Sequence, residues 1–481
     1  MTSLYWLDYE TFGADPQRDR PSQFAGVRTD EDFNILEDPL CLYCKPPEDY
    51  LPHPDACLIT GITPQQALEK GLPEAELIRQ VHAELIRPNT CALGYNSLRF
   101  DDEVTRNTLY RNFYDPYARE WQNGNSRWDL IDVLRATRAL RPEGINWPNS
   151  AEGKASFRLE DLTAANGIAH QGAHDALVDV YATIALAKLV KQAQPKLYQF
   201  LWQHRVKAEV QKILDLGSFT PLVHISGMYA SDRHCLAIVL PLCKHPTDTN
   251  GVVVYDLSVD PEPLLTLSVE AIQQRIFTAK ADLPEGVERI PLKTVHINRC
   301  PVLAPLKVIK PSDAERLSID LSQIKTHLTK LINVPGLSDK IQNVFAANPF
   351  QEKAVDPDLA IYSGGFFSEH DKQQMAKIRS LSPEKLGSAA FTFKDSRLAE
   401  MLFRYRARNY PETLSPNERS QWLDFCRQRL TGLDASGVLT FEAYFGRLDE
   451  LKGEGKSDLG ILESLEAFGF SKRRALVGES A

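Results

Sequence analysis

The feature that most constrains the fold of this chain is its opening stretch, residues 4–13, with the sequence LYWLDYETFG. Its aromatic and aliphatic residues predict a strand buried on both faces within a covered sheet. Because side chains alternate along a strand, Asp8 and Glu10 fall on the same face, one step apart. Neighbouring carboxylates in apolar surroundings repel each other and are poorly solvated. The pair therefore indicates either a site for a hard divalent cation, Mg²⁺ or Mn²⁺, or two solvated acids where the strand leaves the sheet.

The size and composition of the chain limit its class. At 481 residues it should form two or three domains. No apolar run approaches the length of a membrane span, and the N-terminus enters a strand without a basic and apolar leader. We therefore expect a cytoplasmic monomer with no membrane contact. The net charge of −9 argues against a generally basic surface but leaves room for a local basic groove at a nucleic-acid site.

The eight cysteines are scattered along the chain, which in a reducing compartment predicts free thiols. Cys41 and Cys44 form the only close pair in the sequence. They lie in an alternating strand pattern, and no second pair follows at the spacing of a zinc site. We therefore interpret them as ordinary strand residues.

The first part of the chain has the pattern of a mixed α/β domain. Two further strands are expected at 24–29 and 40–45, and the turn-rich segment between them suggests a meander. Helices and strands then alternate, with helices expected at 74–86, 101–110 and 175–189 and a short buried strand at 91–95. A meander followed by this alternation describes a mixed sheet.

The remaining segments predict a change of architecture. A helix is expected from Trp128, with Asp129 as its N-cap, and we assign this acid no chemistry. Short strands separated by polar turns follow at 222–225, 234–240 and 251–255, as in a small barrel or sandwich. From about residue 350 the pattern is helical, and Ser415 opens a capping box. We therefore expect an α/β domain over 1–192, a β-rich domain over 195–348 and a helical domain over 350–481.

Two later segments supply further acids. Asp101 opens a helix that follows a buried strand, and His174 precedes Asp179 by five residues at the start of an alanine-rich helix. On a helix, five residues place two side chains about 140° apart. His174 can therefore reach over a site ligated by Asp179 if it lies in the preceding loop or in the first turn. Taken singly, each motif also fits capped or ion-paired residues without chemistry.

The ordered set of Asp8, Glu10, Asp101 and Asp179, joined by His-x₄-Asp, resembles the DEDDh exonuclease superfamily, whose fold is ribonuclease-H-like. The resemblance extends along the whole chain to the bacterial exonuclease I family. Its middle region is similar to that family's SH3-like domain and its end to the helical extension, although the match after Leu430 is loose. Tyr95 stands where many superfamily members have histidine. The segments that carry this resemblance are 8–13, 99–107, 110–117 and 140–148.

This resemblance implies metal-dependent 3′→5′ hydrolysis of single-stranded DNA to 5′-mononucleotides, in DNA repair and recombination. It implies two Mg²⁺ ions, for which Mn²⁺ can substitute. Asp8, Glu10 and Asp179 would hold one ion, Asp8 and Asp101 the other, and His174 would be the general base. The expected partners are single-stranded DNA and the single-stranded-DNA-binding protein. Arg138 and Arg141 are the residues we expect to contact the acidic tail of that protein.

Between the acid motifs, aromatic residues are interleaved with arginines. Tyr117, Trp121 and Phe157 are either core residues or exposed platforms on which any base can stack, and their polar or Gly- and Pro-rich neighbourhoods favour platforms. The planar guanidinium of arginine suits phosphate, and Arg158 is our first choice for holding the scissile end. The predicted substrate-binding residues are Glu10, Arg106, Tyr117, Trp121, Arg135, Phe157 and Arg158.

Two other functions are compatible with parts of this pattern. An RNA-trimming exonuclease or a proofreading subunit would have the same acids, but such chains usually have a single domain. A non-catalytic binder would keep the acidic cluster only as a structural remnant, which the presence of all four acids together with His174 disfavours.

Overall fold

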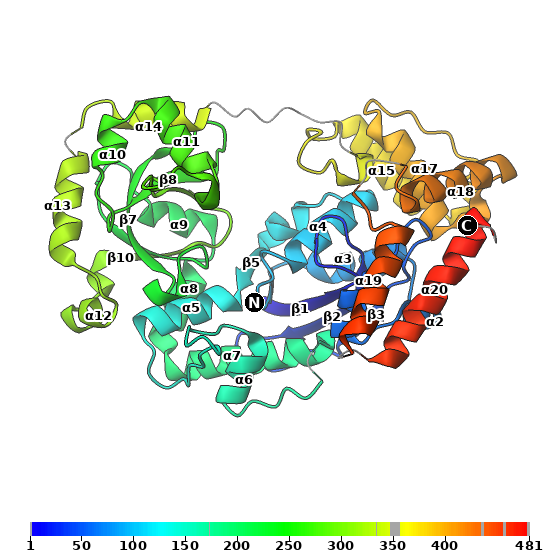
Figure 1. Cartoon of the computed structure of the whole chain (residues 1–481), viewed down its shortest axis with the longest axis horizontal. Helices are drawn as coiled ribbons and strands as arrows, with labels where there is room; N and C mark the ends of the chain where they lie inside the picture. Colours follow the sequence, from blue (N-terminus) through cyan, green and yellow to red (C-terminus); the bar gives the residue numbers. More distant parts are fainter. Residues whose placement is uncertain are drawn as a thin grey trace. The chain divides into compact units, whose positions relative to one another are not determined.

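The computed structural model describes residues 2–172, 174–332, 334–346, 356–433, 437–455 and 458–478. The chain divides into two compact units, each described here by itself (Figure 1). The first comprises Met1–Ser126, His170–Tyr181 and Glu352–Ala481, and the second comprises Arg127–Ala169 and Ala182–Gln351. Among the described residues, no helix is both long and apolar enough to cross a membrane. All eight cysteines are free thiols, as predicted.

The first sheet has the strand order β3-β2-β1-β4-β5. The central strand β1 pairs antiparallel with β2 and parallel with β4, and β2 pairs antiparallel with β3. This confirms the predicted meander and the mixed sheet. The strands are β1 (Ser3–Thr11), β2 (Pro21–Thr29), β3 (Leu40–Tyr43), β4 (Thr90–Gly94) and β5 (Ser126–Asp129).

The helix predicted to begin at Trp128 instead begins at Leu130, after strand β5. Trp128 is 4% exposed, and its ring lies 5.2 Å from those of Tyr198 and Trp202 between centroids. An aromatic residue packed this way fits a pleated strand, so tertiary packing extends the strand to the helix boundary. Asp129 is the N-cap, as predicted, and its carboxylate accepts a hydrogen bond from the amide of Ile131 at 3.1 Å.

The two faces of β1 have different roles. Tyr5, Leu7 and Tyr9 pack in one apolar cluster with residues of α3 (Glu74–Leu85) and α4 (Asp101–Arg111). Because side chains alternate, Asp8 and Glu10 project from the opposite face of the strand. The alternation of the sequence thus separates a core face from a face that carries carboxylates.

The C-terminal helices belong to the same compact unit as the first sheet. Phe113 lies edge-on to Tyr405, and Tyr110 stacks on Phe367, both within an apolar cluster shared with α15 (Glu369–Ser380) and α17 (Arg397–Asn409). The side chain of Asn409 accepts a hydrogen bond from the amide of Ala75 at 2.9 Å. A residue far along the chain therefore supplies the N-terminal cap of α3, which has no side-chain cap of its own.

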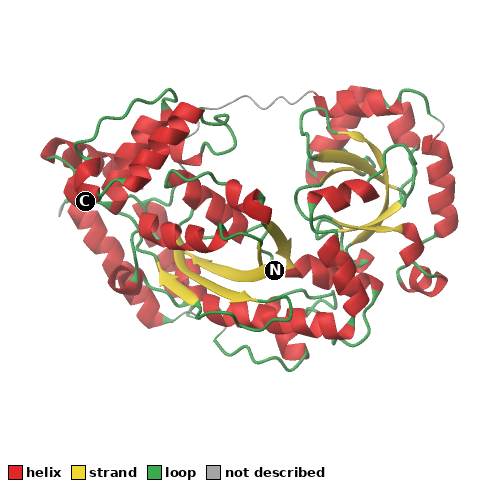
Figure 2. Ribbon diagram, turned by 180° about the vertical axis from the view of Figure 1, so that it is seen from behind, coloured by secondary structure: helices red, strands yellow, loops and turns green. Residues whose placement is uncertain are grey.

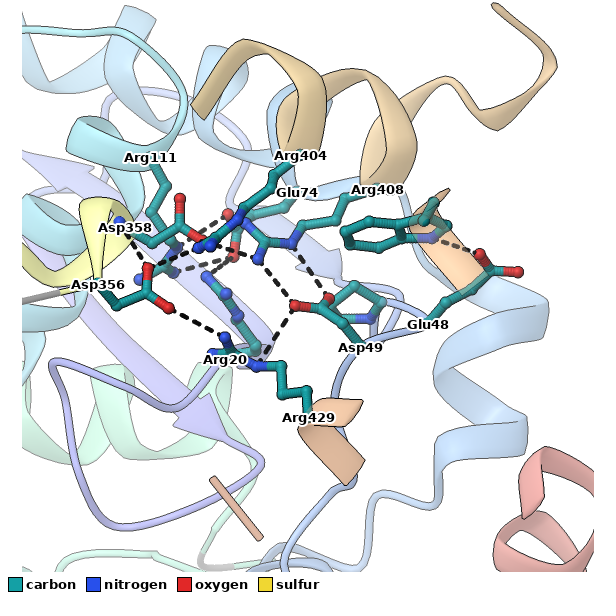
Figure 3. Close-up of polar contacts among 12 residues, drawn as sticks. Arg20, Glu48, Asp49, Glu74, Arg111, Asp356, Asp358, Arg404, Arg408 and Arg429 are labelled. Atoms are coloured by element: carbon teal, nitrogen blue, oxygen red, sulfur yellow. Dashed lines mark hydrogen bonds and ion pairs between the residues drawn. The ribbon is translucent and has the colours of Figure 1, made fainter. Parts of the chain in front are cut away.

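A buried ion-pair network also joins the C-terminal region to α3, α4 and two loops next to the first sheet (Figure 3). Asp49 is 1% exposed and accepts hydrogen bonds from Arg408 at 2.8 and 3.1 Å. Arg408 also donates to Asp358 at 2.8 Å. Single buried charges are costly, so each of these groups is stable there only beside groups of opposite charge. The network consists of Arg20, Asp49, Glu74, Arg111, Asp356, Asp358, Arg404, Arg408 and Arg429.

The second sheet is antiparallel throughout, with the strand order β10-β6-β7-β8-β9 (Figure 2). This confirms the β-rich middle region. The strand predicted from His234 begins two residues later, because His234 and Cys235 have left-handed φ angles of 54° and 55° that interrupt extended backbone. The strands are β6 (Leu222–Ile225), β7 (Leu236–Lys244), β8 (Gly251–Asp256), β9 (Leu292–His296) and β10 (Val302–Pro305).

The other helices complete the two units, and the capping box predicted at Ser415 is present at the start of α18. Their bounds are α1 (Pro54–Thr60), α2 (Pro64–Lys70), α5 (Leu130–Leu140), α6 (Leu159–Ala165), α7 (Ala176–Ala193), α8 (Pro195–Gln203), α9 (Lys207–Ile213), α10 (Glu262–Thr266), α11 (Val269–Phe277), α12 (Pro311–Arg316), α13 (Leu321–Ile332), α14 (Leu337–Ala346), α15 (Glu369–Ser380), α16 (Pro383–Leu386), α17 (Arg397–Asn409), α18 (Pro416–Leu430), α19 (Phe441–Glu454) and α20 (Leu459–Val477).

Candidate active site

The carboxylates of β1 lie in an environment that disfavours their charge. Burial, followed by repulsion from Asp179 and Asp175, raises the pKa of Asp8 to about 8. Burial, followed by repulsion from Asp8, Asp179 and Asp175, raises the pKa of Glu10 to about 9. The charges acting on both groups are carboxylates, so the cluster lacks the positive charge that would hold it ionised at neutral pH. A divalent cation would supply that charge.

Asp101 joins this cluster from α4. It is the first residue of that helix and is 2% exposed. Its Oδ1 accepts a hydrogen bond from the backbone amide of Tyr9 at 2.9 Å, which fixes the carboxylate beside β1 at the residue between Asp8 and Glu10. Burial, followed by repulsion from Asp8, raises the pKa of Asp101 well above its usual value. The structure therefore brings together strand and helix acids that are more than ninety positions apart.

His174 and Asp179 reach the cluster from the start of α7. His174 lies just before that helix with a left-handed φ of 69°, so it occupies the loop position that lets it reach the site. One ligand atom from each of Glu10, His174 and Asp179 lies within 4.8 Å of the others, a spacing at which the three could hold a metal ion. His174 therefore lies in the loop before the helix and reaches the site that Asp179 would ligate, as the His-x₄-Asp spacing allows.

A second histidine, His170, was not predicted as part of the site. Its Nε2 lies 2.6 Å from Oδ1 of Asp179. The sequence signal was a second histidine in the same Gly-containing loop, but its spacing of nine residues from Asp179 matches no helical or strand period. Only the folded loop brings this ring to the carboxylate.

Asp175 was also not predicted. It precedes α7, and its Oδ1 accepts hydrogen bonds from the amides of Leu177 and Val178 at 3.1 and 3.3 Å. It therefore caps the helix while adding negative charge near Asp8 and Glu10. The sequence signal was an aspartate just before an apolar helix, a capping pattern that says nothing about proximity to a metal site.

The raised pKa values predict how stability depends on pH. A carboxyl group whose pKa is higher in the folded state than in the unfolded state stabilises the fold at low pH, and this contribution is lost as the pH rises through the folded value. We expect the unfolding temperature of the metal-free protein to fall between about pH 5 and pH 9, and Mg²⁺ to raise it more at pH 9 than at pH 6. Thermal unfolding in EDTA and in Mg²⁺ measures both effects.

The variant Asp8→Asn provides the matched comparison for this prediction. It removes one titrating group at nearly constant volume, so the fall in unfolding temperature with pH should become shallower in EDTA. An unfolding temperature with the same pH dependence in both proteins would mean that the Asp8 carboxyl is ionised in the metal-free fold.

Apart from Glu10, which belongs to the acid cluster, three predicted substrate-binding residues lie in the first unit. Trp121 is 66% exposed, which excludes the core alternative for this residue. Tyr117 is half-buried, and the guanidinium carbon of Arg106 lies 5.5 Å from its ring centroid. Arg106 itself is 6% exposed and forms ion pairs with Glu103 and Glu120. This geometry gives Arg106 a role in supporting the Tyr117 ring, and direct contact of Arg106 with substrate stays a prediction.

The other three lie in the second unit. Phe157 is half-buried, and the guanidinium carbons of Arg135 and Arg138 lie 5.7 and 5.8 Å from its ring centroid. The ring of Trp147 lies 6.5 Å away. The side chain of Arg158 is 72% exposed and pairs with Glu160 at 3.2 Å. Phe157 is thus a supported aromatic ring among arginines, and Arg158 is accessible to a phosphate.

Comparison with protein families gives three consecutive matches along the chain. The family model described as "Exonuclease" matches residues 5–187. The "Exonuclease I SH3-like domain" matches residues 205–347, and the "Exonuclease I C-terminal domain" matches residues 355–471. Together they cover most of the sequence, in the order predicted from it.

Individual relatives are similar over almost their whole length. The exodeoxyribonuclease I of Haemophilus influenzae is 46% identical over 97% of this chain and 98% of its own. The structure of exonuclease I from Methylocaldum szegediense has a TM-score of 0.94 and 51% identity, covering 98% of this chain and 100% of that one. Escherichia coli exonuclease I in complex with a dA16 oligonucleotide has a TM-score of 0.93 and 46% identity, with coverage of 98% and 100%.

Proposed function

This chain belongs to the exonuclease I family of exodeoxyribonucleases, and we propose that it hydrolyses single-stranded DNA from the 3′ end, releasing 5′-mononucleotides in DNA repair and recombination. The observation that carries this proposal is the convergence of the acids on β1, α4 and α7. Asp101 accepts a hydrogen bond from the backbone of β1. One potential ligand atom from each of Glu10, His174 and Asp179 lies within 4.8 Å of the other two. The similarity to family members over nearly the full length supports the same reaction.

Single-stranded DNA is the proposed substrate because of both the relatives and the exposed aromatics. Escherichia coli exonuclease I has been solved with a dA16 oligonucleotide. In this chain Trp121 is exposed and Phe157 is supported by arginines, which suits stacking on bases of any sequence. The predicted substrate set, Glu10, Arg106, Tyr117, Trp121, Arg135, Phe157 and Arg158, is proposed on this basis.

We propose two Mg²⁺ ions as the cofactor, with Mn²⁺ as a substitute. The residues present fit Mg²⁺ because the site offers carboxylate oxygens, the ligands that hard cations prefer. Their mutual repulsion in buried surroundings also favours a bound positive charge. Asp8, Glu10 and Asp179 would hold one ion, and Asp8 and Asp101 the other. A zinc-bound form of the Escherichia coli enzyme with single-stranded DNA has been solved, which supports a divalent-cation site in the family. Bound divalent ions lower the pKa of water and neutralise the leaving oxyanion.

The chain's own residues would move the proton and orient the acids. His174 would accept the proton of the attacking water on its imidazole, because histidine is the side chain that most often serves as a general base. Its position before α7, beside Glu10, leaves it close to the acids without being part of the helix. The amide of Tyr9 would hold the Asp101 carboxylate in place, and His170 would hold that of Asp179.

We also propose the acidic tail of the single-stranded-DNA-binding protein as a partner. A solved exonuclease I structure that is 45% identical to this chain is an "ExoI/SSB-Ct complex", which contains the C-terminus of the single-stranded-DNA-binding protein. Arg138 and Arg141 are both only partly buried, and Arg141 donates to the carbonyl of Val308 at 3.2 Å while lying 3.6 Å from Asp313. A tail peptide that fails to bind at low salt would exclude this partner.

The domain organisation and location complete the proposal. We propose an exonuclease domain over 1–192, an SH3-like domain over 195–348 and a helical domain over 350–481, which the bounds of the family matches support. We propose a cytoplasmic monomer, in keeping with substrates found in the cell interior.

The test compares substrates under matched conditions. A fluorescence assay with single-stranded DNA, duplex DNA and RNA, each with Mg²⁺ or EDTA, should show cleavage of single-stranded DNA with Mg²⁺ alone. Oligonucleotides blocked at the 3′ or the 5′ end then decide polarity. Preferred cleavage of RNA would favour an RNA-trimming enzyme, and binding without cleavage would favour a non-catalytic binder.

The stacking role of Phe157 leads to a separate prediction. Phe157→Ala should weaken binding of single-stranded DNA about ten-fold, because stacking contributes about 1–3 kcal/mol per base. Arg158→Ala should also weaken binding and reduce the slope of log affinity against log salt by about one counterion. Fluorescence anisotropy across a salt series, with binding measured in EDTA, gives both quantities.

The exposed Lys196 offers a matched control in the same unit. Lys196→Ala removes one positive charge outside the predicted contact set and should change the salt slope little. A Phe157→Ala protein that binds normally but melts several degrees lower would show that this ring only supports the fold.

A further inference from the structure

We propose that Gln23 is a positioning residue, which fixes the start of α7 against the sheet so that His174 and Asp179 meet Glu10. This inference rests on the proposed metal-dependent function. Gln23 carries no charge and offers no proton to the reaction. Gln23 would act by holding His174, in the loop before α7, and Asp179, in α7, in their places.

The location of Gln23 in the sheet puts it next to the site. It lies on β2 as the cross-strand partner of Glu10 and is 1% exposed. Side chains of directly opposed residues on neighbouring strands project from the same face. Gln23 therefore faces the same side of the sheet as Asp8 and Glu10, where α7 begins.

The Gln23 amide bonds to α7 through both of its polar atoms. Nε2 donates to Oδ2 of Asp175 at 3.1 Å, and Oε1 accepts from the backbone amide of Ala176 at 3.1 Å. Nε2 also lies 3.6 Å from Sγ of Cys41 on β3. An ionised carboxylate only accepts and a backbone amide only donates, so the two contacts determine which way the Gln23 amide points. Together they fix both the position and the rotation of the helix start.

The contacts of Asp175 extend this restraint along the helix. Its other oxygen caps α7 by accepting from Leu177 and Val178, and its backbone carbonyl accepts from the amide of Asp179 at 3.0 Å. On the other side it follows His174, whose left-handed backbone leaves little freedom to adjust. A displacement at Asp175 would therefore move both His174 and Asp179 relative to Glu10.

Other side chains at position 23 would lose part of this bond pattern. Glutamate keeps the length but replaces the donor with a carboxylate that repels Asp175. Asparagine is one methylene shorter, and leucine would leave the buried amide of Ala176 without its acceptor. Position 23 therefore requires a side chain of the length of glutamine that carries both a hydrogen-bond donor and an acceptor.

The decisive experiment exchanges donor and acceptor between the two residues. Gln23→Glu should raise the Kd for Mn²⁺, measured by electron paramagnetic resonance without DNA, by about ten-fold or more, and should lower kcat on single-stranded DNA similarly. Asp175→Asn alone should also impair both. In the double variant Gln23→Glu/Asp175→Asn, the amide introduced at position 175 can donate to the carboxylate introduced at position 23. That carboxylate can still accept from the backbone amide of Ala176, so the double variant should bind Mn²⁺ more tightly and turn over faster than either single variant.

The buried Thr29 offers a control for lost stability alone. It lies on the same strand as Gln23, away from α7, and accepts a hydrogen bond from Nε1 of Trp6 at 2.9 Å. Thr29→Val should lower the unfolding temperature but leave the Mn²⁺ affinity and kcat unchanged. The positioning role is refuted if Gln23→Glu binds Mn²⁺ like the wild type, or if the double variant is no better than the single ones.

Failure of the proposed function gives a different outcome. If the wild-type protein does not cleave single-stranded DNA with Mg²⁺, the function is refuted while the Mn²⁺ measurements still decide the role of Gln23. If the wild type cleaves and all Gln23 variants match it in both measurements, only the positioning role is wrong.

Discussion

Asp8→Ala and Asp179→Ala should abolish metal-dependent cleavage of single-stranded DNA. These carboxylates come from β1 and α7 and, with Glu10, supply the negative charge that would hold a divalent ion. Removal of either carboxylate leaves too few oxygen ligands to hold a hard cation. Because the bound cation activates the attacking water, cleavage should stop. Single-turnover cleavage with excess enzyme and Mg²⁺ measures the loss. Calorimetric titration with Mn²⁺ should show the lost ion directly.

His174→Ala should behave differently from the carboxylate variants. A general base contributes about 10²–10⁴ in rate, so turnover should fall by that factor while DNA binding and Mn²⁺ binding survive. Because His170 lies 2.6 Å from Asp179, His170→Gln tests whether that ring is the base instead. Near-normal turnover of His174→Ala, with a large loss in His170→Gln, would transfer the role to His170.

A carboxylate outside the site gives the control for these losses. Asp38 is exposed and belongs to the same compact unit as β1. Asp38→Ala also raises the net charge by one, so it reports any general electrostatic effect on DNA binding. Its turnover should equal that of the wild type, and a comparable loss there would mean that overall charge rather than ligation explains the result.

Much of the site could be predicted because its signals are local. The alternation along residues 4–13 places Asp8 and Glu10 on one face, and the capping and periodicity patterns locate the starts of the helices that carry Asp101 and Asp179. These features depend on the backbone geometry of one element at a time, which a short window of sequence determines.

The parts that sequence patterns missed depend on contacts between distant segments. His170 approaches Asp179 only through the folded loop, and Gln23 is 152 positions from the Asp175 that it bonds. The ion pairs of Arg106 with Glu103 and Glu120 likewise follow no sequence pattern and are visible only after folding. Such pairings have no period, so a single sequence cannot reveal them.

The buried ion-pair network that holds the C-terminal region against α3, α4 and the neighbouring loops gives the second large effect. Asp49→Asn should lower the free energy of unfolding at pH 7 by about 3–5 kcal/mol, because it leaves buried arginines without their counter-charge. Asp49 accepts two hydrogen bonds from Arg408 and lies 3.7 Å from Arg429. Urea-induced unfolding followed by circular dichroism measures the loss. Asp424→Asn, in an exposed pair with Arg427, should cost less than about 1 kcal/mol.

The pH dependence of this loss distinguishes ion pairing from packing. Burial alone would raise the pKa of Asp49, but Arg408 and Arg429 outweigh it and hold this pKa well below its usual value. A carboxyl with a lowered folded pKa stabilises the fold above its unfolded pKa of about 4 and loses that contribution as the pH falls further. The difference between wild type and Asp49→Asn should therefore be largest at neutral pH and shrink below about pH 4. A difference that stays constant down to about pH 3 would mean that shape and hydrogen bonding, rather than charge, make Asp49 necessary.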